Sequence, residues 1–209
     1  MAELNEKFKP NLKDAIANEK AVFKGKFYRI TVLSESLVRL EYDEGSVFED
    51  RPTELVKCRN FPVPEFQVQE NDSILAITTK YFRLQYLKDK PFVGTMFAQD
   101  SNLKVTLNES DKVWYYGHDE ARNFGAIVDN LDTKEPYMSP AEKILEEKQK
   151  KLKKFIKKDD TVKGLYSTDG FATIDDSKSL ILDDKGFLIK DDRQRIDIYL
   201  CIKEILVSV

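Results

Sequence analysis

Apolar and polar residues alternate along much of the chain from residue 26 onward. In the run SLVRLEYD, Val38, Leu40 and Tyr42 occupy alternate positions, and the charged Arg39 and Glu41 fall between them. A two-residue period is typical of a β-strand that buries one face and exposes the other. The pattern therefore predicts a half-buried strand whose two charged side chains face solvent.

The same alternation recurs in short runs on both sides of a central region. In FQVQE, for example, the pattern predicts that Phe66 and Val68 face inward. Many short strands with little helical periodicity between them indicate an all-β protein, an antiparallel β-sandwich. The other runs are ILAITT (74–79), YFRLQYL (81–87), LKVTL (103–107), FATIDD (171–176), SLILDD (179–184), GFLI (186–189) and RIDIYLCI (195–202), with a turn predicted at DDKG (183–186).

One segment, residues 139–160, has a helical pattern instead. Ser139 can cap a helix that has Pro140 at its first position, and Glu142 completes a capping box. The apolar stripe is narrow and the other face is rich in lysine, which favours a solvated helix lying on the sandwich. A membrane surface or a helix-binding partner is the alternative. We therefore expect one charged helix inserted into the sandwich.

The two ends of the predicted domain differ in character. Residues 1–24 are polar and contain Pro10, so they are predicted to form a loosely attached arm on a sandwich domain that spans residues 25–209. Within the sandwich, the segment EDRPTELVKCRNFPVPEF (49–66) carries three prolines. Because proline holds its neighbours in extended conformations, this segment is predicted to be an edge strand or a crossing between sheets.

Composition narrows the possible partners. The net charge is −3, with 41% hydrophobic and 34% charged residues, which disfavours binding to nucleic acid or to anionic lipid. The chain shows neither a secretory signal nor a run of 18 apolar residues, so a cytoplasmic location without membrane insertion is expected. Cys58 and Cys201 are predicted to be buried, reduced thiols. A single histidine and scattered glycines predict no metal site and no nucleotide cofactor.

Four runs in the chain resemble one known family. They are FYRITVLSESLVRLEY, FEDRPTELVKCRNFPVPEF, VWYYGHDEARNFGAIVDNLD and KGLYSTDGFATIDDSKSLILDDKGF. In that order they resemble the N-terminal domain of glycoside hydrolase family 31, the α-glucosidase and α-xylosidase family, over about residues 25–190. The resemblance implies a galactose mutarotase-like β-sandwich. It also implies a domain that packs on a catalytic (β/α)₈ barrel and contributes a loop to the pocket for an α-linked sugar.

The chain does not contain that catalytic barrel, which takes about 250 residues. In the family both catalytic carboxylates are aspartates on barrel loops, so the resemblance assigns no catalytic residue here. We therefore expect a noncatalytic domain of an α-glucosidase-like retaining enzyme, inactive alone, whose partner is the barrel of the parent enzyme.

Four residues are candidates for sugar contact. The resemblance places Asp132, and less directly Asp129, on the loop that approaches the substrate, where a carboxylate can accept hydrogen bonds from two sugar hydroxyls. The alternative for Asp132 is a turn residue bonded to its own backbone. Trp114 can offer its ring to a sugar or pack in the core, and Phe124 can wall the pocket.

Two other functions remain open from the sequence. A standalone carbohydrate-binding module would use Trp114 and its neighbours as a platform. A mutarotase-like epimerase would need a histidine and a carboxylate as acid and base, for which His118 is the sole histidine.

Overall fold

The computed structural model describes most of the chain outside the central region. The described residues are 5, 9–88, 90–95, 97–117, 126–127, 161–162, 167 and 169–202. The chain divides into two compact units, one of residues 1–122 with 166–209 and one of residues 123–165. In the smaller unit the structure describes strands β9 (Ala126–Ile127) and β10 (Thr161–Val162), which pair antiparallel. The predicted helix at 139–160 lies outside the described residues.

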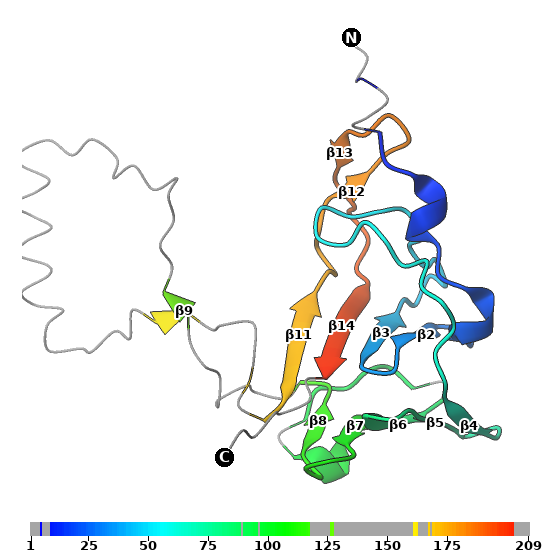
Figure 1. The fold of residues 1–209 in the computed structure, drawn as a ribbon, viewed down its shortest axis with the longest axis vertical. Coiled ribbons are helices and arrows are strands. Elements are labelled where there is room, and N and C mark those ends of the chain that lie inside the picture. The colour runs from blue at the N-terminus through cyan, green and yellow to red at the C-terminus, as the bar shows by residue number, and fades with distance from the viewer. Residues whose placement is uncertain are drawn as a thin grey trace, which may run out of the picture. The chain divides into compact units, whose positions relative to one another are not determined.

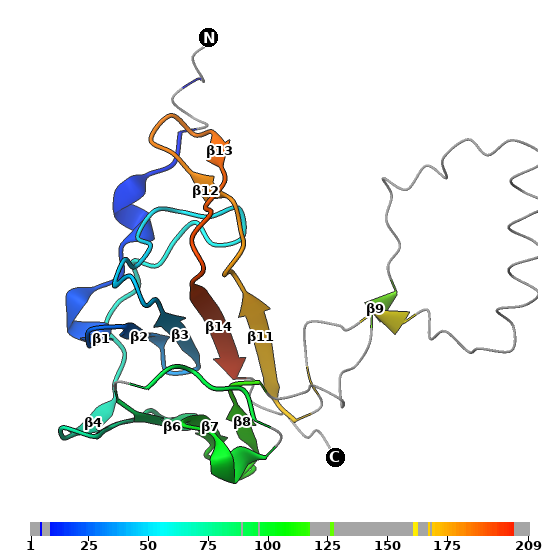
Figure 2. The ribbon, with the colours of Figure 1, turned by 180° about the vertical axis from the view of Figure 1, so that it is seen from behind.

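The larger unit is a β-sandwich, as the alternating pattern predicted. Figures 1 and 2 show its strands in two layers. Every pairing is antiparallel, and each layer is a five-stranded sheet. The first sheet has the order β1 (Val22–Lys24), β2 (Tyr28–Ser34), β3 (Leu37–Tyr42), β14 (Ile196–Ile202), β11 (Phe171–Asp175). The second has the order β4 (Gln67–Glu70), β5 (Ile74–Thr78), β6 (Phe82–Leu87), β7 (Leu103–Leu107), β8 (Val113–Tyr115), and the 3₁₀ turn η4 (Ala98–Asp100) precedes β7.

The core lies between the two sheets and is built from alternate residues of their strands. The rings of Tyr28 in β2 and Tyr86 in β6 meet edge to face across the sandwich, with centroids 4.9 Å apart. The inward positions predicted for β6, β7 and β14 are confirmed, because these strands supply the buried residues Phe82, Leu84, Tyr86, Leu103, Val105, Leu107, Ile198, Leu200 and Ile202.

The edge strand β4 is the exception to this pattern. Val68 pairs with the buried Ile77 but stays exposed, so its predicted burial is wrong. An edge strand has a neighbour on one side only and is covered less well. Phe66, just before β4, does find a partner, because its ring packs edge to face against Phe23 with centroids 5.7 Å apart.

Residues 11–24, which were expected to belong to a loose arm, pack on the sandwich. Asn11 and Asn18 cap two 3₁₀ helices, and Ala15 is fully buried. The helices are η2 (Leu12–Ala15) and η3 (Glu19–Ala21), and the chain then enters the first sheet as β1.

A short hairpin follows β11. Its strands are β12 (Ile181–Leu182) and β13 (Leu188–Ile189), and the turn between them is the predicted DDKG. Gly186 has a φ of +86°, a conformation that glycine adopts without strain, and its amide donates to the carbonyl of Asp183. Thr53 forms an isolated bridge to Ile181, so the hairpin holds the proline-bearing segment near the first sheet.

Candidate functional site

The outer face of the first sheet carries charged side chains that are almost completely buried. Arg39 and Glu41 in β3 are each 2% exposed, so the prediction that they face solvent is wrong. They are covered by residues 47–60, which we call the covering segment. Isolated charges are very unfavourable in such a place, and they persist there only when they are paired and hydrogen-bonded.

Three strands supply the pairs. Arg29 in β2 donates to both carboxylate oxygens of Glu41, at 2.5 and 2.8 Å. Arg39 donates to both oxygens of Asp197 in β14, at 2.8 and 2.7 Å. Arg195 adds a third bond to Asp197, at 2.6 Å. Burial acts to raise the pKa of Asp197, but the hydrogen bonds from Arg39 outweigh it and lower that pKa.

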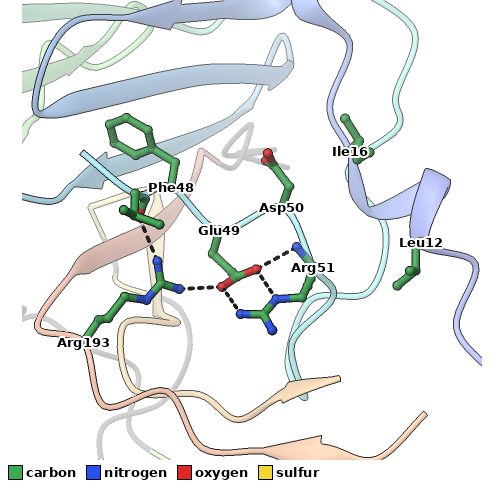
Figure 3. A pocket seen from close by; sticks show the side chains of 8 residues that line it. Leu12, Ile16, Phe48, Glu49, Asp50, Arg51 and Arg193 are labelled. Atoms are coloured by element: carbon green, nitrogen blue, oxygen red, sulfur yellow. Dashed lines mark hydrogen bonds and ion pairs between the residues drawn. The ribbon is translucent and has the colours of Figure 1, made fainter. Parts of the chain in front are cut away.

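The covering segment is attached to this network through Glu49. Its main-chain carbonyl accepts hydrogen bonds from Arg29 at 3.0 Å and from Arg39 at 2.9 Å. Its carboxylate lies between Arg51 and Arg193 and accepts bonds from both (Figure 3). Burial acts to raise the pKa of Glu49, but the hydrogen bonds from the side chain and backbone of Arg51 lower it to about 2.

A second acid, Asp191, binds Arg193 and Arg195. Arg193 donates to both of its oxygens, at 2.9 and 2.8 Å, and Arg195 donates to Oδ2 at 3.0 Å. The bonds from Arg193 lower the pKa of Asp191 to about 2. Asp191 and Glu49 are therefore ionised at neutral pH, and each balances two arginines.

A second buried cluster fixes the other end of the covering segment. The Arg59 guanidinium is fully buried and donates from Nε to the hydroxyl of Tyr199 at 2.5 Å. Its Nη1 donates to the carbonyl of Ala15 at 3.2 Å, and its Nη2 lies 3.8 Å from Asp176. The hydroxyl of Thr53 lies 2.9 Å and 3.0 Å from the two oxygens of Asp176. Burial raises the pKa of Asp176.

This arrangement suits a structural role better than acid–base chemistry. Retaining glycoside hydrolysis needs two carboxyl groups about 5 Å apart across an accessible bond. The acids of the network instead accept hydrogen bonds from arginines or from Thr53, and their orientations are fixed by those bonds. Among the described residues, the network offers no free acid and base pair facing a substrate-sized opening.

Two pockets border this network. One has a volume of about 510 Å³ and combines exposed apolar residues of the N-terminal region with the Glu49 cluster (Figure 3). Its acids are already paired, because Glu49 binds two arginines and Asp50 accepts from Arg29 at 2.6 Å. The lining residues are Leu12, Ile16, Val47, Phe48, Glu49, Asp50, Arg51 and Arg193.

The other pocket, which we call the Asp43 pocket, has a volume of about 590 Å³. It lies where β3 ends and β14 begins, beside the turn that follows β11. Its lining residues are Tyr42, Asp43, Glu44, Gly45, Pro91, Ser177, Lys178, Arg193, Gln194, Arg195 and Ile196.

The structure describes one of the four candidate sugar-contact residues. Trp114 in β8 is 3% exposed and belongs to the core, so its ring is not a sugar platform, and the packing alternative is confirmed. Its neighbour Tyr116 packs against Phe92, with ring centroids 5.7 Å apart. The other three candidates, Asp129, Asp132 and Phe124, lie outside the described residues, and so does His118, the histidine of the epimerase alternative.

Sequence reasoning missed the buried network and Asp43. The available signal was the complementary charge at alternate positions of two strands, with Arg39 and Glu41 in one and Asp197 in the other. Asp43 gave a weaker signal, an acid next to Glu44 and Gly45 at the end of a strand.

The described residues also bear on the predictions about thiols, metal ligands and membrane-spanning helices. Cys58 and Cys201 are free thiols, but Cys58 is exposed, so its predicted burial is wrong. Within the part of the chain that the structure describes, histidine, cysteine and acidic side chains form no cluster of three that could hold a metal ion. No helix among those residues has the length and apolar character needed to span a membrane.

Comparison with known proteins adds no assignment. Neither the protein-family models nor the curated protein sequences gave a match to this chain.

Proposed function

We propose that this chain is the noncatalytic β-sandwich domain of an α-glucosidase-like retaining glycoside hydrolase. In this proposal the domain packs on a catalytic (β/α)₈ barrel that residues 1–209 do not contain. The segment that includes Asp129 and Asp132 extends toward the barrel and forms one wall of the pocket for an α-linked sugar.

One observation carries the proposal: polar residues from separate family-like runs meet in the buried network. The runs that begin at Phe27 and Phe48 meet where Arg39 donates to the Glu49 carbonyl, and the runs that begin at Phe48 and Lys163 meet where Arg59 lies 3.8 Å from Asp176. The side chains of Thr53 and Asp176 touch although 123 positions separate them in the chain. Because these contacts join residues of different runs, they support the interpretation that the runs are parts of one structural domain.

The charge pairing also supports a noncatalytic role. A catalytic carboxyl changes its protonation or bonding during turnover, and the pKa values of such groups lie near the working pH. Glu49 and Asp191 have pKa values of about 2, and both are tied to arginines. These acids are therefore suited to holding the covering segment and poorly suited to proton transfer at neutral pH.

The structure weakens the case for a carbohydrate-binding module that uses Trp114. Aromatic binding platforms need an open ring face, whereas this indole is buried in the core. The epimerase alternative stays a prediction, because His118 lies outside the described residues.

The DNA that follows codon 209 provides the direct test. The proposal predicts that one of the three forward frames encodes a (β/α)₈ barrel with the two catalytic aspartates of the family. Absence of a barrel from all three frames would contradict it. The purified 209-residue chain should also release no nitrophenol from 4-nitrophenyl α-glucoside above the buffer rate, and turnover at an enzymatic rate would equally contradict the proposal.

A further inference from the structure

The Asp43 pocket contains a buried carboxylate oxygen that has no hydrogen-bond donor. Asp43 is 6% exposed, and its Oδ1 accepts a bond from the amide of Gly45 at 2.6 Å. Its main chain is also engaged, since its amide donates to Phe27 and its carbonyl accepts from Ser46. The remaining oxygen, Oδ2, is buried without a hydrogen-bond partner in the part of the chain that the structure describes.

A buried carboxylate oxygen without a hydrogen-bond donor is unusual in a folded protein. Buried polar atoms in folded proteins nearly always have a partner, and an unpartnered charged one carries a large desolvation penalty. The nearby Asp197 and Glu49 follow the rule, because arginines donate to both oxygens of each. Asp43 therefore differs from the acids of the structural network, and it lines a pocket.

The other polar groups of the pocket are also available. Glu44, Lys178 and Gln194 are exposed and form no hydrogen bond or ion pair with any described residue. The Ser177 hydroxyl accepts a bond from the amide of Asp197 at 3.0 Å, which leaves its own proton to donate. Arg193 and Arg195, by contrast, already bind Asp191.

The pocket also has apolar surface next to these groups. Pro91 is exposed, Ile196 is half-buried, and Tyr42 also lines the pocket, with its ring 5.5 Å from that of Phe92. Ligand sites usually combine an apolar wall with a few polar groups that converge on the ligand, in volumes of about 300–1,000 Å³. The volume of about 590 Å³ falls in this range.

We propose that the Asp43 pocket binds a neutral polyhydroxylated ligand of the size of a monosaccharide or disaccharide. One hydroxyl donates to Asp43 Oδ2, and other hydroxyls bond to Lys178, Gln194 and Ser177. The C–H face of the ring packs on Pro91 and Ile196.

Hydrogen-bonding capacity decides between this ligand and its main rival, a small ammonium compound. The free groups are carboxylate acceptors at Asp43 and Glu44, a donor at Lys178, and groups at Gln194 and Ser177 that can donate. A hydroxyl both donates and accepts, so a polyol can bond to all five residues. An ammonium ion would satisfy the two carboxylates but could accept no bond from Lys178 or Ser177.

The test uses the 209-residue chain, with amide NMR spectra recorded during titration with methyl α-glucoside or maltose. We expect saturable shift changes at the amides of Gly45, Lys178 and Ile196. Asp43→Asn should weaken binding at least tenfold, because the charge-assisted acceptor is lost while Oδ1 can still accept from Gly45. Asp192→Asn is the matched control, since Asp192 is exposed, lies two residues before Gln194 but outside the lining, and its replacement should leave affinity unchanged.

Thermal unfolding without ligand separates binding from a structural role of Asp43. Because Asn removes an unpartnered buried charge, Asp43→Asn should melt at the same temperature as the native chain or higher. The proposal is overturned if both sugars leave these amides unmoved, if Asp43→Asn binds them as tightly as the native chain, or if it melts at a lower temperature. Saturable binding of ethylammonium chloride without sugar binding would also overturn it. None of these readouts depends on a barrel, so they are independent of the test of the proposed function.

Discussion

Replacing Arg39 with methionine should lower the free energy of unfolding of the sandwich more than a substitution at an exposed arginine does. The native guanidinium binds both oxygens of Asp197, lies 3.0 Å from Glu41 and donates to the Glu49 carbonyl at 2.9 Å. Methionine fills a similar volume but supplies none of these bonds. Asp197 would keep Arg195 as its remaining guanidinium partner.

The expected magnitude follows from the burial of both partners. Removing one member of a buried ion pair costs about 3–5 kcal/mol, because the other charge stays buried with too few partners. Since Arg195 still binds Asp197, we expect the lower end, about 3 kcal/mol of the free energy of unfolding. Urea denaturation followed by circular dichroism measures this value, provided that the slope with urea is unchanged.

Two further variants make the Arg39 test decisive. Arg83→Met removes an exposed arginine from β6 and should change the free energy of unfolding by less than about 0.5 kcal/mol. The double variant Arg39→Met with Asp197→Leu should cost less than the sum of the two single changes, because it leaves no unpaired charge at that position. A loss below about 1 kcal/mol for Arg39→Met would refute the structural role given to the network.

Two other predictions concern the same sandwich. Glu49 has a folded-state pKa of about 2, below its ordinary value of about 4.3, so its stabilising contribution is complete above about pH 5 and is lost as the pH falls toward 2. Glu49→Gln should therefore lower the free energy of unfolding by up to about 3 kcal/mol at pH 7. It should also flatten the pH dependence of that free energy, measured by urea unfolding, between about pH 5 and pH 2. An unchanged pH dependence would disprove this prediction. Trp114→Ala should cost about 3–5 kcal/mol, and the native tryptophan should emit at short wavelength and resist iodide quenching, whereas ready quenching would show that the ring is exposed.

Periodicity predicted the strands well where each strand has one covered face. Strands β6 and β7 bury alternate residues such as Leu84 and Val105, while the intervening residues are exposed in β6 and half-buried in β7, so local alternation contains the information needed. In β3 both faces are buried, because the covering segment packs over Arg39 and Glu41. The contacts that bury these charges come from outside the strand, from Glu49 ten positions later and from Asp197 158 positions later, so the alternation within β3 does not reveal them.

The candidate site was harder to predict for a similar reason. The sequence allowed Trp114 to be a platform or a core residue, and contacts with the opposite sheet decide for the core. The free oxygen of Asp43 is a property of its surroundings, since another aspartate in a turn, Asp183, accepts bonds from nearby amides and is only half-buried. The asparagine caps at Asn11 and Asn18 are signals that the sequence did contain.

Native-state hydrogen exchange tests most directly whether the covering segment is an integral part of the sandwich. The amide of Glu54 donates to Leu180, and that of Arg59 donates to Asp14 at 2.7 Å. If the buried arginine network holds this segment, both amides should exchange about as slowly as that of Leu40 in β3, and Arg39→Met should accelerate them. Exchange of Glu54 and Arg59 in the native chain as fast as that of an exposed β4 amide would contradict the central claim.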